Sequence, residues 1–208
     1  MFNDRYGLTE SVLQGRKTMT RRNIPTSKYA YINSKEIEKG NNNCYYVNDS
    51  VADYREASSY KIGEVVAVAQ PYRNVYAKYI NDWAAHGYQL FREDCAEAFR
   101  SRYEKESGWG NKMFVKADIM PHHIRITNVR IERLQDISNE DCMREGIFLW
   151  DDPFHEDKVK YFGFFGALKH YEPPRDAFAA LIDKIGGKGT WERNDYVWVY
   201  EFFLYQKQ

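Results

Sequence analysis

The segment from Gly15 to Arg22, GRKTMTRR, carries the side chains best suited to chemistry. Four cations fall within seven residues without an acid among them: Arg16, Lys17, Arg21 and Arg22. The hydroxyls of Thr18 and Thr20 stand beside them. In a chain of balanced charge, four such cations next to a turn form a candidate anion site. The pattern is equally typical of a solvated basic turn, and spacing alone leaves both interpretations open.

The elements around this segment set its position. Thr9 is a candidate cap for a short helix over residues 10–14, and Gly15 stands where a left-handed terminator belongs. Residues 17–24 are predicted to be extended, because Pro25 prevents them from running on as a helix. The cations would therefore follow a turn and lie on a strand.

The rest of the chain alternates short strands with lone helices. Residues 124–134 alternate in polarity, with a slip at Thr127–Asn128 that indicates a bulge or bend. The other expected elements are strands at 63–69 and 196–205, with helices at 90–105, 138–145 and 174–185. No regular βαβ rhythm appears, so the pattern predicts an α+β fold.

Composition narrows the function classes. The chain has 208 residues with 30 basic and 30 acidic side chains, which excludes binding to nucleic acid through bulk charge alone. No window approaches eighteen apolar residues and the start does not resemble a signal peptide, so we expect no membrane partner. Three scattered cysteines are typical of reduced thiols and predict a cytoplasmic protein. We expect neither a metal site nor another cofactor. Aromatic residues make up 16% of the chain, which fits either a ring-filled core or a groove that stacks bases.

Several blocks of the sequence resemble a known family in the right order. Gly15, Lys17, Thr20 and Arg22 match the G-x-K-x-x-T-x-R signature of the ASCH domain, a branch of the PUA-like superfamily. The strand at 63–68, the segment 126–138, the Glu-Gly-Ile at 145–147 and the closing strand at 191–201 are also similar to the family's blocks. The combination is most similar to larger ASCH-like proteins of phages and prophages.

The resemblance implies both a fold and functions. It implies one domain over residues 1–208, a small, mostly antiparallel β-barrel with short flanking helices. Insertions would fall at about 26–60, 72–120 and 148–173. PUA-like domains mostly bind RNA or modified bases, some small ASCH proteins are amidohydrolases that deacetylate acetylcytidine, and one group is described as ribonucleases.

The amidohydrolase residues carry over by position onto Lys17, Thr20 and Glu145. In that hypothesis the Thr20 hydroxyl attacks an acyl carbon and Glu145 passes a proton to the leaving amine. Lys17 either activates the Thr20 hydroxyl or stabilises the oxyanion. A basic Lys17 would need a pKa lowered by about 3 units, whereas a charged donor needs no shift. On a regular strand positions 17 and 20 face opposite sides, so the hypothesis requires a bulge or helical turn between them.

We therefore expect a basic cleft formed by residues 15–22, the strand beginning at Gly63 and the helix that carries Glu145. It would bind RNA or a modified nucleoside through the four cations, Arg16, Lys17, Arg21 and Arg22. Hydrolysis of acylated nucleosides is the alternative, and a phage-related accessory or structural role is a third. A basic cleft would favour binding to nucleic acid. An acidic or apolar cleft would favour the accessory or structural role. The sequence leaves the oligomeric state open.

Overall fold

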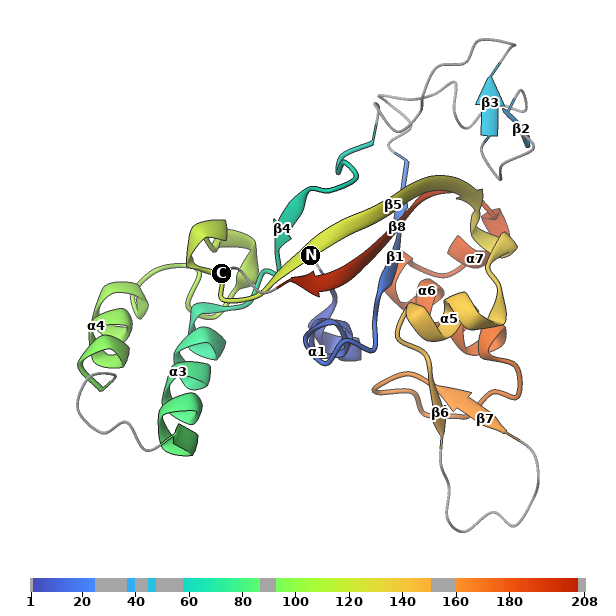
Figure 1. The fold of residues 1–208 in the computed structure, drawn as a ribbon. Helices are drawn as coiled ribbons and strands as arrows, with labels where there is room; N and C mark the ends of the chain where they lie inside the picture. Colours follow the sequence, from blue (N-terminus) through green and yellow to red (C-terminus); the bar gives the residue numbers. More distant parts are fainter. Residues whose placement is uncertain are drawn as a thin grey trace. The chain divides into compact units, whose positions relative to one another are not determined.

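The structure is a computed structural model that describes residues 2–24, 37–39, 45–47, 58–86, 93–150 and 160–205 (Figure 1). These residues fall into two compact units. Unit 1 consists mainly of Val65–Ile124, and unit 2 of the described residues within Asn3–Glu64 and Arg125–Leu204. Unit 1 thus contains most of the insertion expected at 72–120, while parts of those at 26–60 and 148–173 lie outside the described residues. That the chain forms a single domain stays a prediction.

The elements of unit 2 include most of the long strands. In chain order they are η1 (Asp4–Tyr6), α1 (Leu8–Leu13), β1 (Met19–Asn23), β2 (Ile37–Lys39), β3 (Tyr45–Val47), most of β5 (His123–Arg133), η4 (Leu134–Asp136), α5 (Asn139–Arg144), β6 (Phe148–Trp150), β7 (Tyr161–Gly163), α6 (Pro174–Gly186), α7 (Thr190–Arg193) and β8 (Tyr196–Tyr205). Unit 1 holds β4 (Val65–Ala67), α3 (Tyr72–His86), α4 (Glu93–Tyr103), η2 (Lys112–Phe114), η3 (Ala117–Ile119) and the start of β5.

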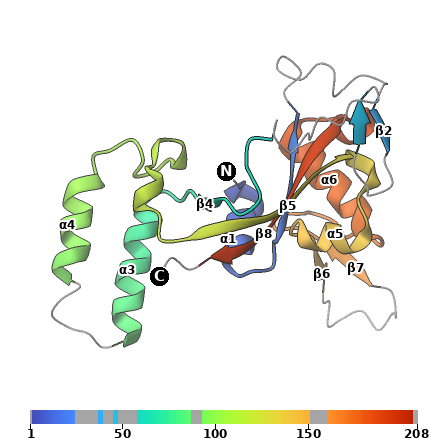
Figure 2. The ribbon, with the colours of Figure 1, turned by 45° about the horizontal axis from the view of Figure 1, so that its top comes forward.

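Four strands form one antiparallel sheet in the order β1-β8-β5-β4. β1 and β8 pair from Met19 opposite Glu201 to Asn23 opposite Val197, and Figures 1 and 2 show β1, β8 and β5 side by side. An antiparallel sheet with separate helices confirms the α+β class. The described strands leave this sheet open, so they do not form the closed barrel that the resemblance implies.

The predicted strand and helix boundaries near the site are largely confirmed. β5 buries Ile124 and Ile126, exposes Thr127, and then buries Val129 and Ile131, which is the slip expected from the sequence. In α6, the proline at the start fixes the first turn, and a buried face packs this helix against α5, α7 and β7. Figure 2 shows α5 and α6 next to each other. The helix α5, which leads into Glu145, is therefore supported by packing against α6.

Unit 1 has an aromatic core of its own. Tyr72, Val75, Tyr103 and Met120 are buried together, and the helices α3 and α4 pack on each other. The Tyr72 and Phe99 rings meet edge to face with centroids 6.0 Å apart. This explains part of the high aromatic content by core packing, the first of the two interpretations of the composition.

Three local expectations were wrong. The N-cap of α1 is Gly7 and not Thr9, whose hydroxyl donates to the Asp4 carboxylate from inside the first turn. The apolar run after Gly63 predicts a buried strand, but β4 is exposed or half-buried, because it is the edge strand of the sheet. The helix α3, over Tyr72–His86, was not expected from the sequence.

Candidate functional site

Lys17 and Glu145 lie 128 positions apart in the chain and meet in the interior of unit 2. The Lys17 Nζ donates to Glu145 Oε2 at 2.6 Å and to the backbone oxygen of Glu145, also at 2.6 Å. The two side chains are only 1% and 5% exposed. The structure thus brings together two of the three residues of the amidohydrolase hypothesis.

Turns at both ends position this pair. Gly15, with φ of 72°, ends α1 in a left-handed conformation, and the Lys17 backbone N–H then donates to Ser11 O at 2.9 Å. On the other side, the Ser138 hydroxyl caps α5 by accepting from the Asp141 N–H at 3.1 Å. Glu145 is the C-cap of α5, so its carboxylate lies at the end of this helix, next to Lys17 of the segment that follows α1.

Arg21 joins the pair to a wider buried ionic network. Its NH1 donates to Glu145 Oε1 at 3.2 Å and its NH2 to Glu132 Oε2 at 2.8 Å. The network contains four cations and four carboxylates: Lys17, Arg21, Arg130 and Arg144 with Glu132, Asp141, Glu145 and Glu201. Lys17 and Arg21 are therefore not uncompensated cations, because acids distant in sequence neutralise them. These two residues are buried and do not present a basic surface to a ligand.

Burial and neighbouring charges shift the pKa values of several groups in and beside the network. Burial lowers the pKa of the Lys17 ammonium, against the attraction of Glu145. Burial disfavours the charged form of Glu201, but the hydrogen bond from Arg144 and the charges of Arg130 and Arg144 outweigh it and lower its pKa. Burial raises the pKa of the Cys142 thiol from 9.0 to about 12, so this thiol is unreactive.

Thr20 and Arg22 lie on the other face of β1. Along this strand, buried Met19 and Arg21 alternate with half-buried Thr20 and Arg22. Because Lys17 and Arg21 both bond to Glu145, they occupy one side of the segment, and Thr20 faces away from them, opposite Tyr200 on β8. The geometry that the nucleophile hypothesis requires of Thr20 is therefore missing from this arrangement.

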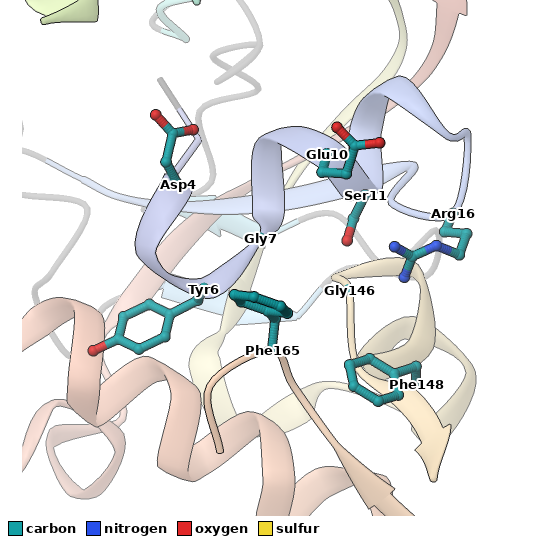
Figure 3. Close-up of a pocket in the computed structure, with 9 residues that line it drawn as sticks. All are labelled: Asp4, Tyr6, Gly7, Glu10, Ser11, Arg16, Gly146, Phe148 and Phe165. Carbon is teal, nitrogen blue, oxygen red and sulfur yellow. The ribbon is translucent and has the colours of Figure 1, made fainter. Parts of the chain in front are cut away.

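A pocket of about 500 Å³ opens next to the Lys17–Glu145 pair (Figure 3). Its walls come from four short segments of unit 2: Asp4, Tyr6, Gly7, Glu10 and Ser11 of η1 and α1, Arg16, Gly146 with Phe148, and Phe165. The volume lies within the range of small-molecule sites, about 300–1,000 Å³. Among the expected binding cations, only Arg16 lines this pocket.

Gly146 is the link between the pocket and the ionic pair. It lines the pocket directly after Glu145, and a Cβ added to it would lie 3.8 Å from Lys17 Cδ and 3.0 Å from Leu8 Cδ2. Its φ of 107° also disfavours any side chain. The buried pair therefore holds one wall of the pocket in place.

Aromatic rings form much of the lining. Figure 3 shows the ring of Phe165 lying between Tyr6 and Phe148. Gly7 allows this placement, since a Cβ there would approach Phe165 Cβ to 3.0 Å. Phe165 is 65% exposed, so most of its ring is available to a ligand. Flat rings on the wall suit a planar, weakly polar group.

The polar groups of the pocket are fixed by short hydrogen-bond chains. Arg16 donates from Nε and NH2 to Gln14 Oε1 at 2.9 and 2.7 Å, and Gln14 Nε2 donates to Glu10 Oε1 at 2.7 Å. Figure 3 shows the Arg16 guanidinium and the Ser11 side chain turned toward the same space. The lining thus offers a cation, a hydroxyl and the carboxylates of Asp4 and Glu10, so it is mixed and not basic.

Sequence reasoning missed most of this lining. Asp4, Tyr6, Phe148 and Phe165 were not singled out, because no spacing pattern connects four segments that only the fold brings together. The one available signal in the sequence was the high aromatic content, which was consistent with a groove that stacks bases as well as with a ring-filled core. We found no group of three or more potential metal ligands and no helix capable of crossing a membrane in the part of the chain that the structure describes.

Comparison with protein-family models, with curated proteins and with solved structures gives no match to this chain. The site is therefore interpreted from its own geometry.

Proposed function

We propose that this protein binds a nucleobase, as a modified nucleoside or as part of RNA, in the pocket between α1, Phe148 and Phe165. The observation that carries the proposal is the combination of flat aromatic walls with Arg16, Ser11 and two carboxylates. A nucleobase presents a stacking face together with donors and acceptors on its edge. A PUA-like fold and membership of the ASCH family are part of the same proposal.

The charges of the pocket favour a base edge over a phosphate chain. One cation, Arg16, stands against two carboxylates, Asp4 and Glu10, so a polyphosphate would meet net repulsion. A base with an exocyclic amine instead donates to a carboxylate while a carbonyl (cytosine, guanine) or a ring nitrogen (adenine) accepts from Arg16. We therefore expect cytosine, adenine or guanine derivatives to bind more tightly than uracil derivatives.

This mixed lining also bears on the accessory-protein alternative. An apolar or acidic surface alone would favour that role, but here Arg16 is held in position by Gln14. A scaffold does not require the Arg16 guanidinium to be oriented beside the exposed ring of Phe165, whereas a small-molecule site does. Nucleoside binding that depends on both residues would separate the two functions.

Calorimetric titration of the four common ribonucleosides and of acetylcytidine tests the proposal. We expect Phe165→Ala to weaken binding roughly 5- to 140-fold, because base stacking on an aromatic ring contributes about 1–3 kcal/mol. Arg16→Ala should weaken it by a similar factor, since a hydrogen bond to a charged group contributes about 1.5–3 kcal/mol. Both residues are exposed, so neither truncation disturbs the core.

Arg193→Ala is the matched control, because this arginine at the end of α7 is half-exposed, pairs with Asp195 and does not line the pocket. It should leave the affinity unchanged. Absence of binding to these nucleosides and to a short single-stranded RNA by the unmodified protein, or equal losses in all three variants, would refute the proposal.

Amidohydrolysis of an acylated nucleoside is the second candidate, favoured by the direct contact of Lys17 with Glu145. In that reaction water adds to the acyl carbon, the C–N bond breaks, and the acid and the free amine leave. The orientation of Thr20 opposes it. Liquid chromatography of cytidine released from acetylcytidine decides between base binding and hydrolysis. Binding of acetylcytidine without release of cytidine supports a binding protein, and release that Arg16→Ala abolishes supports the enzyme.

A further inference from the structure

A row of aromatic rings continues from the pocket along the hairpin of β6 and β7. Phe148 lines the pocket, and its ring stacks with Trp150 at a centroid distance of 5.9 Å and an interplanar angle of 22°. Trp150 in turn lies 4.3 Å from the His170 ring, and the Tyr161 ring lies 6.1 Å from His170. The row therefore begins inside the pocket and leads out of it.

Strand geometry places these rings on one side of the hairpin. In β6, Phe148 and Trp150 share a face because side chains alternate, and Leu149 between them points the other way and is 47% exposed. β6 pairs with β7 so that Phe148 lies opposite Gly163. A Cβ on Gly163 would come within 3.3 Å of the Trp150 ring, so the glycine lets this ring lie flat across the neighbouring strand.

The core of unit 2 does not bury these four rings completely. Phe148, Trp150 and Tyr161 are half-buried and His170 is exposed, so each keeps part of its surface for a ligand. Exposed Lys160 and Lys169 flank the row along the chain. Proteins that bind a single strand combine aromatic side chains, on which successive bases stack, with cations that follow the backbone.

We propose that this row, Phe148, Trp150, Tyr161 and His170, stacks the nucleotides that adjoin the base held in the pocket. The ligand is then a single-stranded nucleic acid, not a free nucleoside. This inference rests on the proposed function, because it takes the pocket as the place of the first base. Few cations are involved, so the affinity depends on stacking and only weakly on salt.

The test compares short and long ligands by calorimetry, using cytidine 5′-monophosphate and the tetranucleotides r(ACGU) and d(ACGT). We expect the unmodified protein to bind r(ACGU) more tightly than the monophosphate. Trp150→Ala should weaken tetranucleotide binding roughly 5- to 140-fold and leave monophosphate binding unchanged. Trp150→Phe should restore most of the loss, because a ring that can stack remains.

Leu149→Ala provides the control on the same strand, since this side chain points away from the row. It should change neither affinity, and far-UV circular dichroism checks that each variant is folded. Binding of r(ACGU) and d(ACGT) with equal affinity identifies a strand reader indifferent to the sugar, and preference for r(ACGU) identifies an RNA reader; both support the inference.

The inference and the function on which it rests fail in different ways. Equal affinity for monophosphate and tetranucleotide, or a tetranucleotide affinity that Trp150→Ala leaves intact, overturns the stacking row while the pocket stands. Tetranucleotide binding that requires Trp150 but not Arg16 overturns the pocket while the row stands. Absence of binding to every ligand overturns both.

Discussion

Removal of the charge on Glu145 should destabilise the protein far more than removal of an exposed ion pair. The Glu145 carboxylate, 5% exposed, is the acceptor for both Lys17 Nζ at 2.6 Å and Arg21 NH1 at 3.2 Å. In Glu145→Gln, Arg21 keeps Glu132, whereas Lys17 loses its 2.6 Å contact with the Glu145 carboxylate and keeps the hydrogen bond to the backbone oxygen of residue 145. The variant therefore buries the Lys17 ammonium without the carboxylate that balances its charge at this position.

The expected loss follows from this geometry. Breaking a buried pair by removing one partner costs about 3–5 kcal/mol. At about 2–4 °C per kcal/mol for a chain of this size, the Tm should fall by roughly 6–20 °C. The double variant Lys17→Met/Glu145→Gln removes the unpaired charge as well, so it should recover most of the lost stability.

Urea unfolding monitored by tryptophan fluorescence measures these differences, because Trp198 is 2% exposed in the core of unit 2. Asp195→Asn in the exposed pair of Arg193 and Asp195 is the control and should cost less than about 1 kcal/mol. A loss for Glu145→Gln as small as that control, or a double variant as unstable as the sum of the single ones, would refute the assignment of a tightly coupled buried pair.

Four further predictions concern stability and thiol reactivity. Because folding lowers the pKa of Glu201, its charged carboxylate stabilises the fold at pH values above its unfolded pKa of about 4.3, and this stabilisation is lost as the pH falls through the folded pKa. In Glu201→Gln, the free energy of unfolding should therefore fall less steeply as the solution is acidified. A decrease as steep as in the unmodified protein would contradict this. Folding raises the pKa of the Cys142 thiol from 9.0 to about 12, so above pH 9.0 the unfolded chain ionises this thiol while the folded chain does not. The free energy of unfolding should therefore fall by about 2 kcal/mol at pH 10.5, and Cys142→Ala should remove this decrease. In a labelling experiment read by peptide mass, exposed Cys95 should react with iodoacetamide while Cys142 is protected. Gly7→Ala should cost more stability than Gly15→Ala, because both have positive φ but only at Gly7 would the new Cβ meet Phe165, at 3.0 Å; equal losses would show that this contact relaxes freely.

Local signals in the sequence predicted the secondary structure near the site. The serine before α5, the proline at the start of α6 and the polarity slip in β5 each act within a few residues, and the structure has all three. Residues 17–24 were expected to be extended, and β1 lies there. α3 was not expected, because its aromatic and apolar residues are mixed with polar ones and give no clear stripe.

The site itself was only partly predictable. The resemblance pointed to Lys17 and Glu145, which meet, but also to Thr20, which the strand alternation turns away. The cations looked uncompensated because Glu132 and Glu145 are distant in sequence and approach only in the folded chain. Charge balance in a folded site depends on such long-range contacts, and a single sequence does not show them.

Photocrosslinking would locate the ligand most directly. A tetranucleotide carrying one 4-thiouridine is irradiated with the unmodified protein, and the modified peptides are identified by mass spectrometry. We predict crosslinks to Tyr6, Phe148, Trp150 or Phe165, on the pocket wall and the adjoining hairpin. Crosslinks confined to the segment around Thr20 and Arg22, or to α4, would contradict the pocket as the site of base binding.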